Sequence, residues 1–233
     1  MKPIIQLTDV KKIFQLGKHQ VRAVDGVSLD IHEGEICCFL GTSGSGKSTL
    51  LNLMAGFEKP SIGSIQICNT KLEHLNEQSL THYRQSHIGF IFQAYNLIES
   101  LTALDNVSLP LTFRGVKRKD RIERARDILK AVGLEGYDDH KPSQMSGGQQ
   151  QRVGIARALI CKPRILFADE PTGNLDTHTT DEVINMMVNI AKKNNQTMIM
   201  VTHEPELSNY ADRTFHMKDG VIEKVENHNE VQR

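Results

Sequence analysis

The sequence predicts an α/β fold with a mostly parallel sheet, an N-terminal antiparallel β subdomain and an inserted α-helical subdomain. Region 4–31 consists of short alternating apolar and polar runs separated by turn residues, a pattern typical of antiparallel strands. Continuous apolar runs at 35–40, 165–168 and 197–201 alternate with helical patterns, an order of elements that is typical of a parallel sheet. We predict one domain over 1–233, with a core at 1–92 and 150–233 and the helical subdomain at about 93–149.

Several helices can be located by their apolar spacing. The first covers 47–55, stops at Gly56 and follows the apolar strand 35–40 directly. A second covers 120–132, where Asp120 and Glu123 have the spacing of a capping box and Gly133 suits the left-handed position after the helix. A third covers about 179–192.

Composition narrows the function. The chain has 28 Lys plus Arg and 28 Asp plus Glu, so it lacks the basic footprint of a nucleic-acid binder, and we predict no nucleic-acid partner. The four cysteines have no C-x-x-C spacing, which argues against a zinc or redox site. No apolar stretch approaches the ~20 residues that cross a bilayer. If a membrane is involved, we expect a partner to supply it.

A glycine-rich segment between the strand 35–40 and the helix 47–55 satisfies G-x-x-x-x-G-K-[ST] in the structural context that this motif requires. Its backbone N–H groups and the helix N-terminus suit phosphate oxygens, Lys47 suits the β and γ phosphates, and Ser48 suits Mg²⁺. A Gly/Ser-rich turn that merely caps a helix would not explain a lysine there. The motif predicts a P-loop NTPase core. Its residues are Gly41, Thr42, Ser43, Gly44, Ser45, Gly46, Lys47, Ser48 and Thr49.

Two acids end the buried strand 165–168. In a P-loop site a carboxylate at this place holds magnesium through water, a role we assign to Asp169. Glu170 points differently and is available to polarise an attacking water. The alternative is that the two acids cap the next helix or are only solvated. Adjacent acids with different tasks favour hydrolysis.

A second glycine-rich helix start lies at 146–149, where Ser146, Gly147, Gly148 and Gln149 open the helical run 150–159. A serine and two glycines before a helix form a second anion cradle. Taken alone, the segment also fits an ordinary capped helix.

Here the chain resembles the ABC ATPase superfamily, whose signature reads L-S-G-G-Q, with Met145 in place of the leucine. The resemblance covers nearly the whole chain and implies two further catalytic residues, His203 and Gln93, the latter also a magnesium ligand. Without the resemblance, His203 would fit a structural role, and nothing in the sequence would mark Gln93 as functional. Phe14 matches the adenine platform, often tyrosine, although plain core packing remains its alternative. The ordered matches are 41–49, Gln93, 146–149, Asp169, Glu170, Asp176 and His203.

The resemblance also implies how such a chain works. The signature of one copy closes over ATP held by the glycine-rich loop of another, so two copies sandwich two ATP molecules with Mg²⁺. The partner would be a membrane-spanning permease, with this chain at the cytoplasmic face of the membrane. Segments 89–93, 101–107 and 168–176 resemble the lipoprotein-release, macrolide-export and bacitracin-resistance subgroup.

Two other functional classes remain open. A non-transport ABC ATPase acting on a soluble macromolecule normally has two cassettes or a long coiled-coil insertion, and this sequence shows neither. A phosphotransferase would explain 41–49 but not the second cradle. The basic run 114–121 suits a solvated face, or contact with anionic lipid or the partner. The tail 226–233 is polar, and we expect it to be loose.

Overall fold

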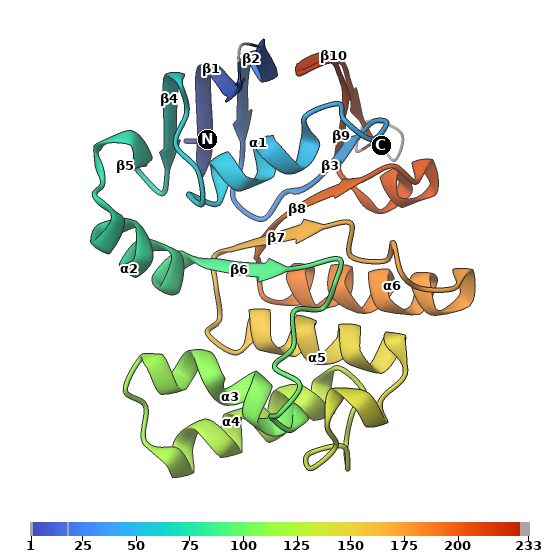
Figure 1. The fold of residues 1–233 in the computed structure, drawn as a ribbon. Helices are drawn as coiled ribbons and strands as arrows, with labels where there is room; N and C mark the ends of the chain where they lie inside the picture. The colour runs from blue at the N-terminus through green and yellow to red at the C-terminus, as the bar shows by residue number, and fades with distance from the viewer. Residues whose placement is uncertain (1, 18, 229–233) are drawn as a thin grey trace.

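Two β-sheets and a set of helices make up the fold in the computed structural model, which describes residues 2–17 and 19–228 (Figure 1). A four-stranded antiparallel sheet has the order β2-β1-β4-β5, and a six-stranded sheet has the order β10-β9-β3-β8-β7-β6. The α/β class and the antiparallel N-terminal part are therefore as predicted. The strands are β1 (Ile5–Leu16), β2 (His19–Ile31), β3 (Ile36–Leu40), β4 (Ile62–Ile67), β5 (Thr70–Lys71), β6 (Ile88–Ile91), β7 (Ile165–Asp169), β8 (Thr197–Thr202), β9 (Arg213–Lys218) and β10 (Val221–Asn227).

The helices alternate with the strands of the larger sheet, and none of those described is long and apolar enough to cross a membrane. In that sheet β6, β7, β8, β3 and β9 run parallel, and β10 pairs with β9 antiparallel. The helices are α1 (Lys47–Met54), α2 (Glu77–His87), α3 (Ala103–Phe113), α4 (Arg118–Ala131), α5 (Gly147–Leu159) and α6 (Thr177–Lys193), with 3₁₀ turns at Leu72–His74, Pro142–Gln144 and Pro205–Tyr210.

Both faces of the parallel sheet are buried, and successive side chains of a strand enter different cores. On β3, Cys37 and Phe39 pack with Leu50 and Leu51 of α1, whereas Cys38 packs into the core formed with α5 and α6. This alternation follows from the two-residue period of a strand. Figure 1 accordingly shows α1 on one side of the sheet and α5 and α6 on the other.

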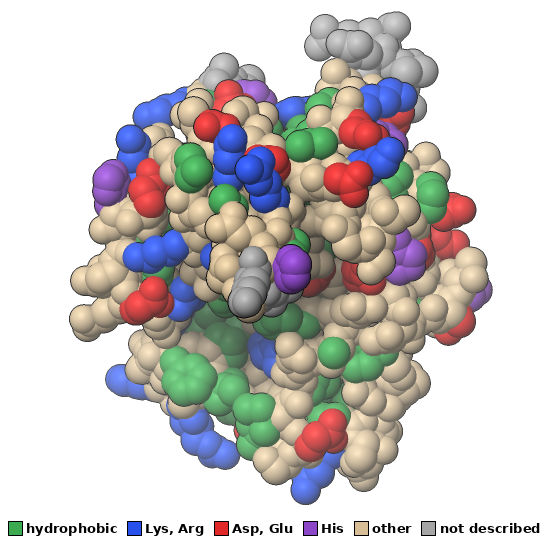
Figure 2. Space-filling view, turned by 45° about the horizontal axis from the view of Figure 1, so that its top comes forward, with side chains coloured by type: hydrophobic (Ala, Val, Ile, Leu, Met, Phe, Trp, Pro, Cys, Tyr) green, Lys and Arg blue, Asp and Glu red, His purple; other side chains and the backbone are tan. Residues whose placement is uncertain are grey.

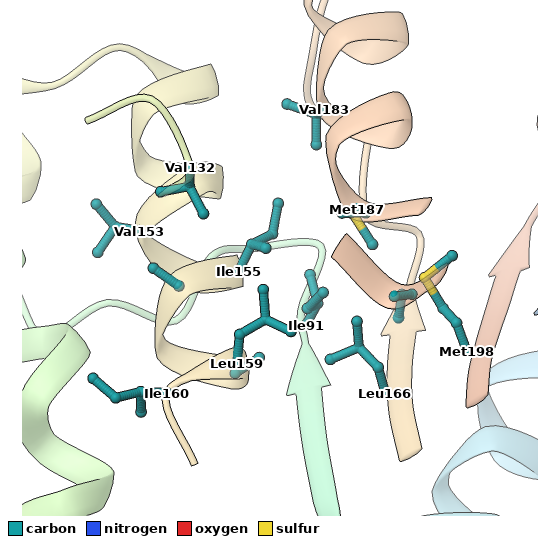
Figure 3. Close-up of a cluster of buried hydrophobic side chains, with 14 of the residues drawn as sticks. Ile91, Val132, Val153, Ile155, Leu159, Ile160, Leu166, Val183, Met187 and Met198 are labelled. Carbon is teal, nitrogen blue, oxygen red and sulfur yellow. The ribbon is translucent and has the colours of Figure 1, made fainter. Parts of the chain in front are cut away.

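The core below the sheet is aliphatic. Figure 3 shows side chains from β6, β7 and β8 directed toward those of α5 and α6. Its labelled members are Ile91, Val132, Val153, Ile155, Leu159, Ile160, Leu166, Val183, Met187 and Met198. Because this packing fixes α5 against the sheet, it sets the place of the signature segment relative to the two acids at the end of β7.

Two local expectations need correction. Helix α4 begins at Arg118 rather than at a cap on Asp120, because Arg121 N already donates to Lys117 O (3.1 Å). Asp120 lies in the first turn, where its charge favours the helix N-terminus. Gly133 does adopt the left-handed conformation (φ 77°). The tail was expected to be loose from residue 226, but β10 extends to Asn227 and His228 N donates to Asp212 O. Residues 229–233 lie outside the described residues.

Candidate active site

The glycine-rich loop leaves the end of β3 and enters α1 at Lys47. At its last residue, Gly46, φ is 98°, and a Cβ atom would lie 2.1 Å from the Ala23 carbonyl oxygen. Only glycine fits that position. Since the loop leads directly into the N-terminus of α1, its backbone N–H groups and the helix dipole have the arrangement that suits an anion.

Lys47 holds the loop closed in this structure. Its side chain is buried, and Nζ donates to Gly41 O (2.7 Å) and Thr42 O (2.8 Å). Burial lowers the pKa of Lys47, and the nearby carboxylates Glu170 and Asp169 oppose that shift. Phosphate oxygens could replace the two carbonyl acceptors without displacing the amine from the site.

Ser48 of α1 and Asp169 of β7 come together because β3, which leads into α1, and β7 are both neighbours of β8. Ser48 Oγ donates to Asp169 Oδ1 at 2.9 Å. Burial raises the pKa of the Asp169 carboxyl, and Glu170 adds to that effect, while the hydrogen bond from Ser48 opposes it. A hydroxyl and a partly desolvated carboxylate are oxygen ligands that fit Mg²⁺.

Glu170, His203 and Gln93 converge beside this pair. His203 Nδ1 lies 3.2 Å from Glu170 Oε1. A Cβ at Gly173 would be 2.8 Å from Gln93 Nε2 and 3.4 Å from Glu170 Oε2, so the two side chains border the same small space. A cavity of about 550 Å³ is lined here by Leu40, Gly41, Thr42, Ser43, Glu170, His203 and Pro205.

A tight turn after β7 separates the directions of the two acids. Glu170 has φ 42°, a left-handed conformation that is uncommon for a glutamate. Its N–H donates to Val201 O (3.0 Å), and its carbonyl accepts from Gly173 N (3.1 Å). Glu170 therefore faces His203, whereas Asp169 faces Ser48.

The signature segment forms the N-terminus of α5. Ser146 is the N-cap: its Oγ accepts from Gln149 N (3.3 Å), and Gln149 Oε1 accepts from Ser146 N (2.9 Å). Gly148 lies so close to α6 that a Cβ atom would be 2.6 Å from Thr179 Cγ2. The capped-helix interpretation is thus correct for the local structure, and the glycines keep the approach to the helix open.

The two glycine-rich helix starts lie on opposite faces of the parallel sheet. The loop that ends at Gly46 opens α1, and the segment 146–149 opens α5, across the sheet from α1 (Figure 1). The loop cavity is lined from the ends of β3, β7 and β8, and the surroundings of Gly147 are Tyr95 and Leu175. Within one chain the two cradles therefore do not form one pocket.

Asp176 and Phe14 lie outside the loop cavity. Asp176 caps α6, accepting from Thr179 N (3.0 Å) and Thr179 Oγ1 (2.7 Å), and these bonds lower the pKa of its carboxyl. Phe14 is half-buried on β1 opposite Val21 of β2, with Lys12 Nζ 5.0 Å from its ring centroid. Since Ala23 of β2 touches the loop, the ring lies on the sheet that borders the cradle.

Three polar residues that the sequence reasoning missed tie these parts together. Gln151 is fully buried in α5, and its Nε2 donates to Pro171 O (2.5 Å) and approaches Phe92 O (3.5 Å). Arg157, also on α5, donates to Tyr95 O (2.7 Å), and Asn174 donates to Gln93 O (2.9 Å). The sequence did contain a signal for Gln151, because a glutamine among apolar neighbours on the inner face of 150–159 indicates a buried hydrogen bond.

Comparison with known proteins agrees with this geometry. The family profile described as ABC transporter matches residues 24–173. The ABC transporter ATP-binding protein YtrE of Bacillus subtilis is 42% identical over 94% of this chain and 96% of its own length. The macrolide export ATP-binding/permease protein MacB of Escherichia coli is 40% identical over 95% of this chain, which spans only 34% of that longer protein.

Among solved structures, the dimeric post-hydrolysis state of the ATP-binding cassette MJ0796 bound to ADP and Pi superposes with a TM-score of 0.90. It is 40% identical, over 96% of this chain and 98% of that one. The structure of cbiO1 from Clostridium perfringens has a TM-score of 0.87 at 29% identity, over 99% and 91% of the two chains. The fold, the ordered motifs and these relatives together show that the chain belongs to the ABC transporter family, as an ATP-binding and ATP-hydrolysing domain.

Proposed function

We propose that this protein hydrolyses ATP as a dimer and that each of its two sites is shared between two copies, which drive a separate membrane permease. The observation that carries the proposal is the placement of the two cradles on opposite faces of one sheet. A signature segment that cannot reach its own glycine-rich loop is free to cover the loop of a second copy. Closure of the dimer would then complete both sites together.

The loop residues 41–49 would hold the phosphates of ATP. Lys47 would exchange its two carbonyl acceptors for β- and γ-phosphate oxygens, a charge-assisted contact stronger than the bonds it leaves. Ser48 Oγ, Asp169 and Gln93 would hold Mg²⁺, which supplies positive charge against the phosphate oxygens. The ring of Phe14 would stack on the adenine, since any purine face suits an aromatic side chain.

Hydrolysis would use the residues at the ends of β7 and β8. Glu170 accepts a proton from a water whose oxygen forms a bond to the γ-phosphorus, while the bond from that phosphorus to the bridging oxygen breaks and ADP leaves with the electron pair. His203 would orient that water, and its 3.2 Å contact keeps the Glu170 carboxylate in place. Gln93 borders the same space.

The second copy would supply the remaining contacts. Ser146, Gly147 and Gly148 would donate to the γ-phosphate from the N-terminus of α5, where unpaired N–H groups and the helix dipole favour an anion. Gln149 would hold Ser146 in place through their reciprocal bonds. Asp176, fixed at the N-terminus of α6 beside this segment, would line the interface.

A groove between α2, β6 and α3 is the surface we assign to the permease. It has a volume of about 230 Å³, and Phe90, Pro110 and Phe113 are among its lining residues. Phe113 is 71% exposed, and Phe57, whose ring packs edge-on against Phe90 of the groove, is 47% exposed, so large apolar side chains are uncovered side by side here. Figure 2 shows hydrophobic side chains gathered on the lower half of the face drawn there, where the surface is hollowed. Attachment through this groove would hold the protein at the cytoplasmic face of the membrane.

Size-exclusion chromatography with Mg-ATP tests the shared site. Glu170→Gln should retain ATP binding but lose the proton acceptor, so hydrolysis should fall by roughly 10²–10⁴-fold and an ATP-bound dimer should accumulate. The matched control is Glu204→Gln, which changes a nearby glutamate. This variant should hydrolyse ATP at the wild-type rate and elute as the wild type does. A Glu170→Gln protein that binds ATP and stays monomeric at every concentration would refute the shared site. Co-purification with a detergent-solubilised permease, lost in Phe113→Glu, separates a transporter subunit from a free-standing ATPase.

A further inference from the structure

A second large cavity, of about 710 Å³, lies at the opposite end of the parallel strands from the nucleotide loop. Pro163 and Gln196, which line it, come just before the first residues of β7 and β8, whereas the loop cavity lies at the carboxyl ends of these strands. In Figure 1 the C-terminal ends of α5 and α6 reach this side of the molecule, on the left. Nothing in the ATPase mechanism uses it.

The walls of the cavity are apolar and come from four helices or their ends. They include Leu111 of α3, Ile128 of α4, Ile160 after α5 and Ile190 of α6. The volume is within the roughly 300–1,000 Å³ of small-molecule pockets. The cavity therefore offers hydrocarbon contacts to a ligand of modest size.

The rim of the cavity is cationic. Arg114, Arg124, Lys162 and Lys193 line it, with Asp127 as its only carboxylate. Within the described residues, 2–17 and 19–228, none of these four cations makes a side-chain hydrogen bond or an ion pair. On the same helix as Arg124, by contrast, Arg126 pairs with Asp138 (2.7 Å) and Lys130 with Glu135 (2.8 Å).

Helix dipoles account for part of this charge but not for all of it. Lys193 ends α6, Lys162 follows α5, and Arg114 follows α3, so these three cations lie at or just beyond helix C-termini, which favour positive charge. Arg124 lies in the middle of α4, where the helix dipole does not stabilise its positive charge. Four positive charges around apolar walls form a field that favours an anion.

We propose that this cavity binds a single-chain anionic amphiphile, with its hydrocarbon chain against the apolar walls and its carboxylate or phosphate head among the four cations. Burial of the chain removes apolar surface from water, and the head neutralises cations that have no partner. Arg114 and Cys161 also line the groove assigned to the permease, so an occupant of the cavity would adjoin that contact.

Calorimetric titration of the full chain with dodecanoate, below its micelle concentration, tests the proposal. Dodecanoate should bind saturably, and dodecyl maltoside, which has a similar chain without the charge, should bind more weakly. Arg124→Gln should weaken dodecanoate binding by up to about fivefold, the range of one partly exposed ion pair, whereas Arg126→Gln on the same helix should not. Both variants should hydrolyse ATP as the wild type does, because neither residue touches the nucleotide site. Equal affinity of the two amphiphiles, or equal loss in the two variants, would overturn the proposal.

Cys161 gives a second readout that locates the ligand. Cys37 and Cys38 are fully buried, and in a Cys68→Ser protein Cys161 is the remaining half-buried thiol. Dodecanoate should slow the alkylation of Cys161 by N-ethylmaleimide, and the protection should shrink in Arg124→Gln. Undiminished alkylation at saturating dodecanoate would place the binding elsewhere and overturn the proposal.

Vesicles distinguish a membrane lipid from a free amphiphile as the source of the anion. Flotation with phosphatidylcholine vesicles, with or without phosphatidylglycerol, should show binding that depends on the anionic lipid and on Arg124 if the source is the bilayer. Dodecanoate binding without vesicle binding would identify a soluble amphiphile. Absence of both forms of binding would overturn the proposal.

Discussion

Ser48 and Asp169 lie 121 residues apart in the sequence, and a hydrogen bond of 2.9 Å joins Ser48 Oγ to Asp169 Oδ1. The bond links the first turn of α1 to the end of β7, so two of the residues proposed to hold Mg²⁺ are in direct contact in this structure. The glycine-rich loop is also held, because Lys47 is bonded to its carbonyls. The binding half of the site is therefore preorganised, whereas the signature half faces away.

Lys47→Ala removes the amine at the centre of the cradle. Loss of its charge-assisted bonds, worth about 1.5–3 kcal/mol, should weaken ATP affinity by roughly 10- to 100-fold. Fluorescence titration with a labelled ATP analogue measures this, with Lys59→Ala as a control at an exposed lysine. Equal affinity in Lys47→Ala and the wild type would show that the loop is not the phosphate site.

Ser146→Arg tests the signature separately from the loop. The new side chain should block the approach of a second copy while the glycine-rich loop, across the sheet, stays intact. ATP affinity of the monomer should be unchanged, and turnover should be lost. Ser143→Arg, an exposed serine in the preceding 3₁₀ turn, is the control. Full turnover in Ser146→Arg would contradict a site shared between copies.

Asp169→Asn should separate stability from function. Burial raises the folded-state pKa of Asp169 above the ordinary value of about 3.9, so the folded protein retains this proton to higher pH than the unfolded chain. Its contribution to stability thus falls as pH rises through that window, and the ionised carboxylate is unfavourable at neutral pH.

The neutral amide should therefore raise the Tm of the nucleotide-free protein at pH 7, by about 2–4 °C for each kcal/mol recovered. The gain should shrink as the pH is lowered toward the ordinary carboxyl pKa. Hydrolysis and the rise of Tm on adding Mg-ATP should both be lost. A lower Tm for the variant at pH 7, measured by scanning calorimetry, would show that the carboxylate stabilises the empty site.

Gln151→Leu tests the connection between α5 and the acidic turn. The substitution removes the donor to Pro171 O, and an unpaired buried carbonyl costs about 1–3 kcal/mol. The free energy of unfolding in urea should fall by that amount, and turnover should fall while ATP affinity is kept. Gln150→Leu is the matched control, because among the described residues the amide of Gln150 donates only to Met145 O, in the turn just before its own helix. Equal urea midpoints for Gln151→Leu and the wild type would refute a structural connection.

The sequence predicted those features that are encoded locally. The strand at 36–40, the loop to Lys47 and the start of α1 are adjacent in the chain, so their pattern determined both structure and chemistry. The apolar strands of the parallel sheet were recognisable because both of their faces are buried.

Features that depend on distant contacts, or on details of the local backbone, could not be predicted. The capping box at Asp120 failed because α4 begins one turn earlier, at a residue without a side-chain cap. Gln151 was overlooked because its partners, Phe92 and Pro171, are distant in sequence. The sequence predicted that Asp169 and Glu170 point in different directions, but not the left-handed conformation of Glu170 (φ 42°) that separates them.

The placement of α1 and α5 on opposite faces has a genetic consequence. Two defective alleles, Lys47→Ala and Ser146→Ala, which removes the signature hydroxyl without adding bulk, should complement each other when mixed, because the loop of the second and the signature of the first rebuild one sound pocket. Such a hybrid would have a single working pocket of the two, and a population of such hybrids would reveal whether one turnover per cycle suffices to move the permease.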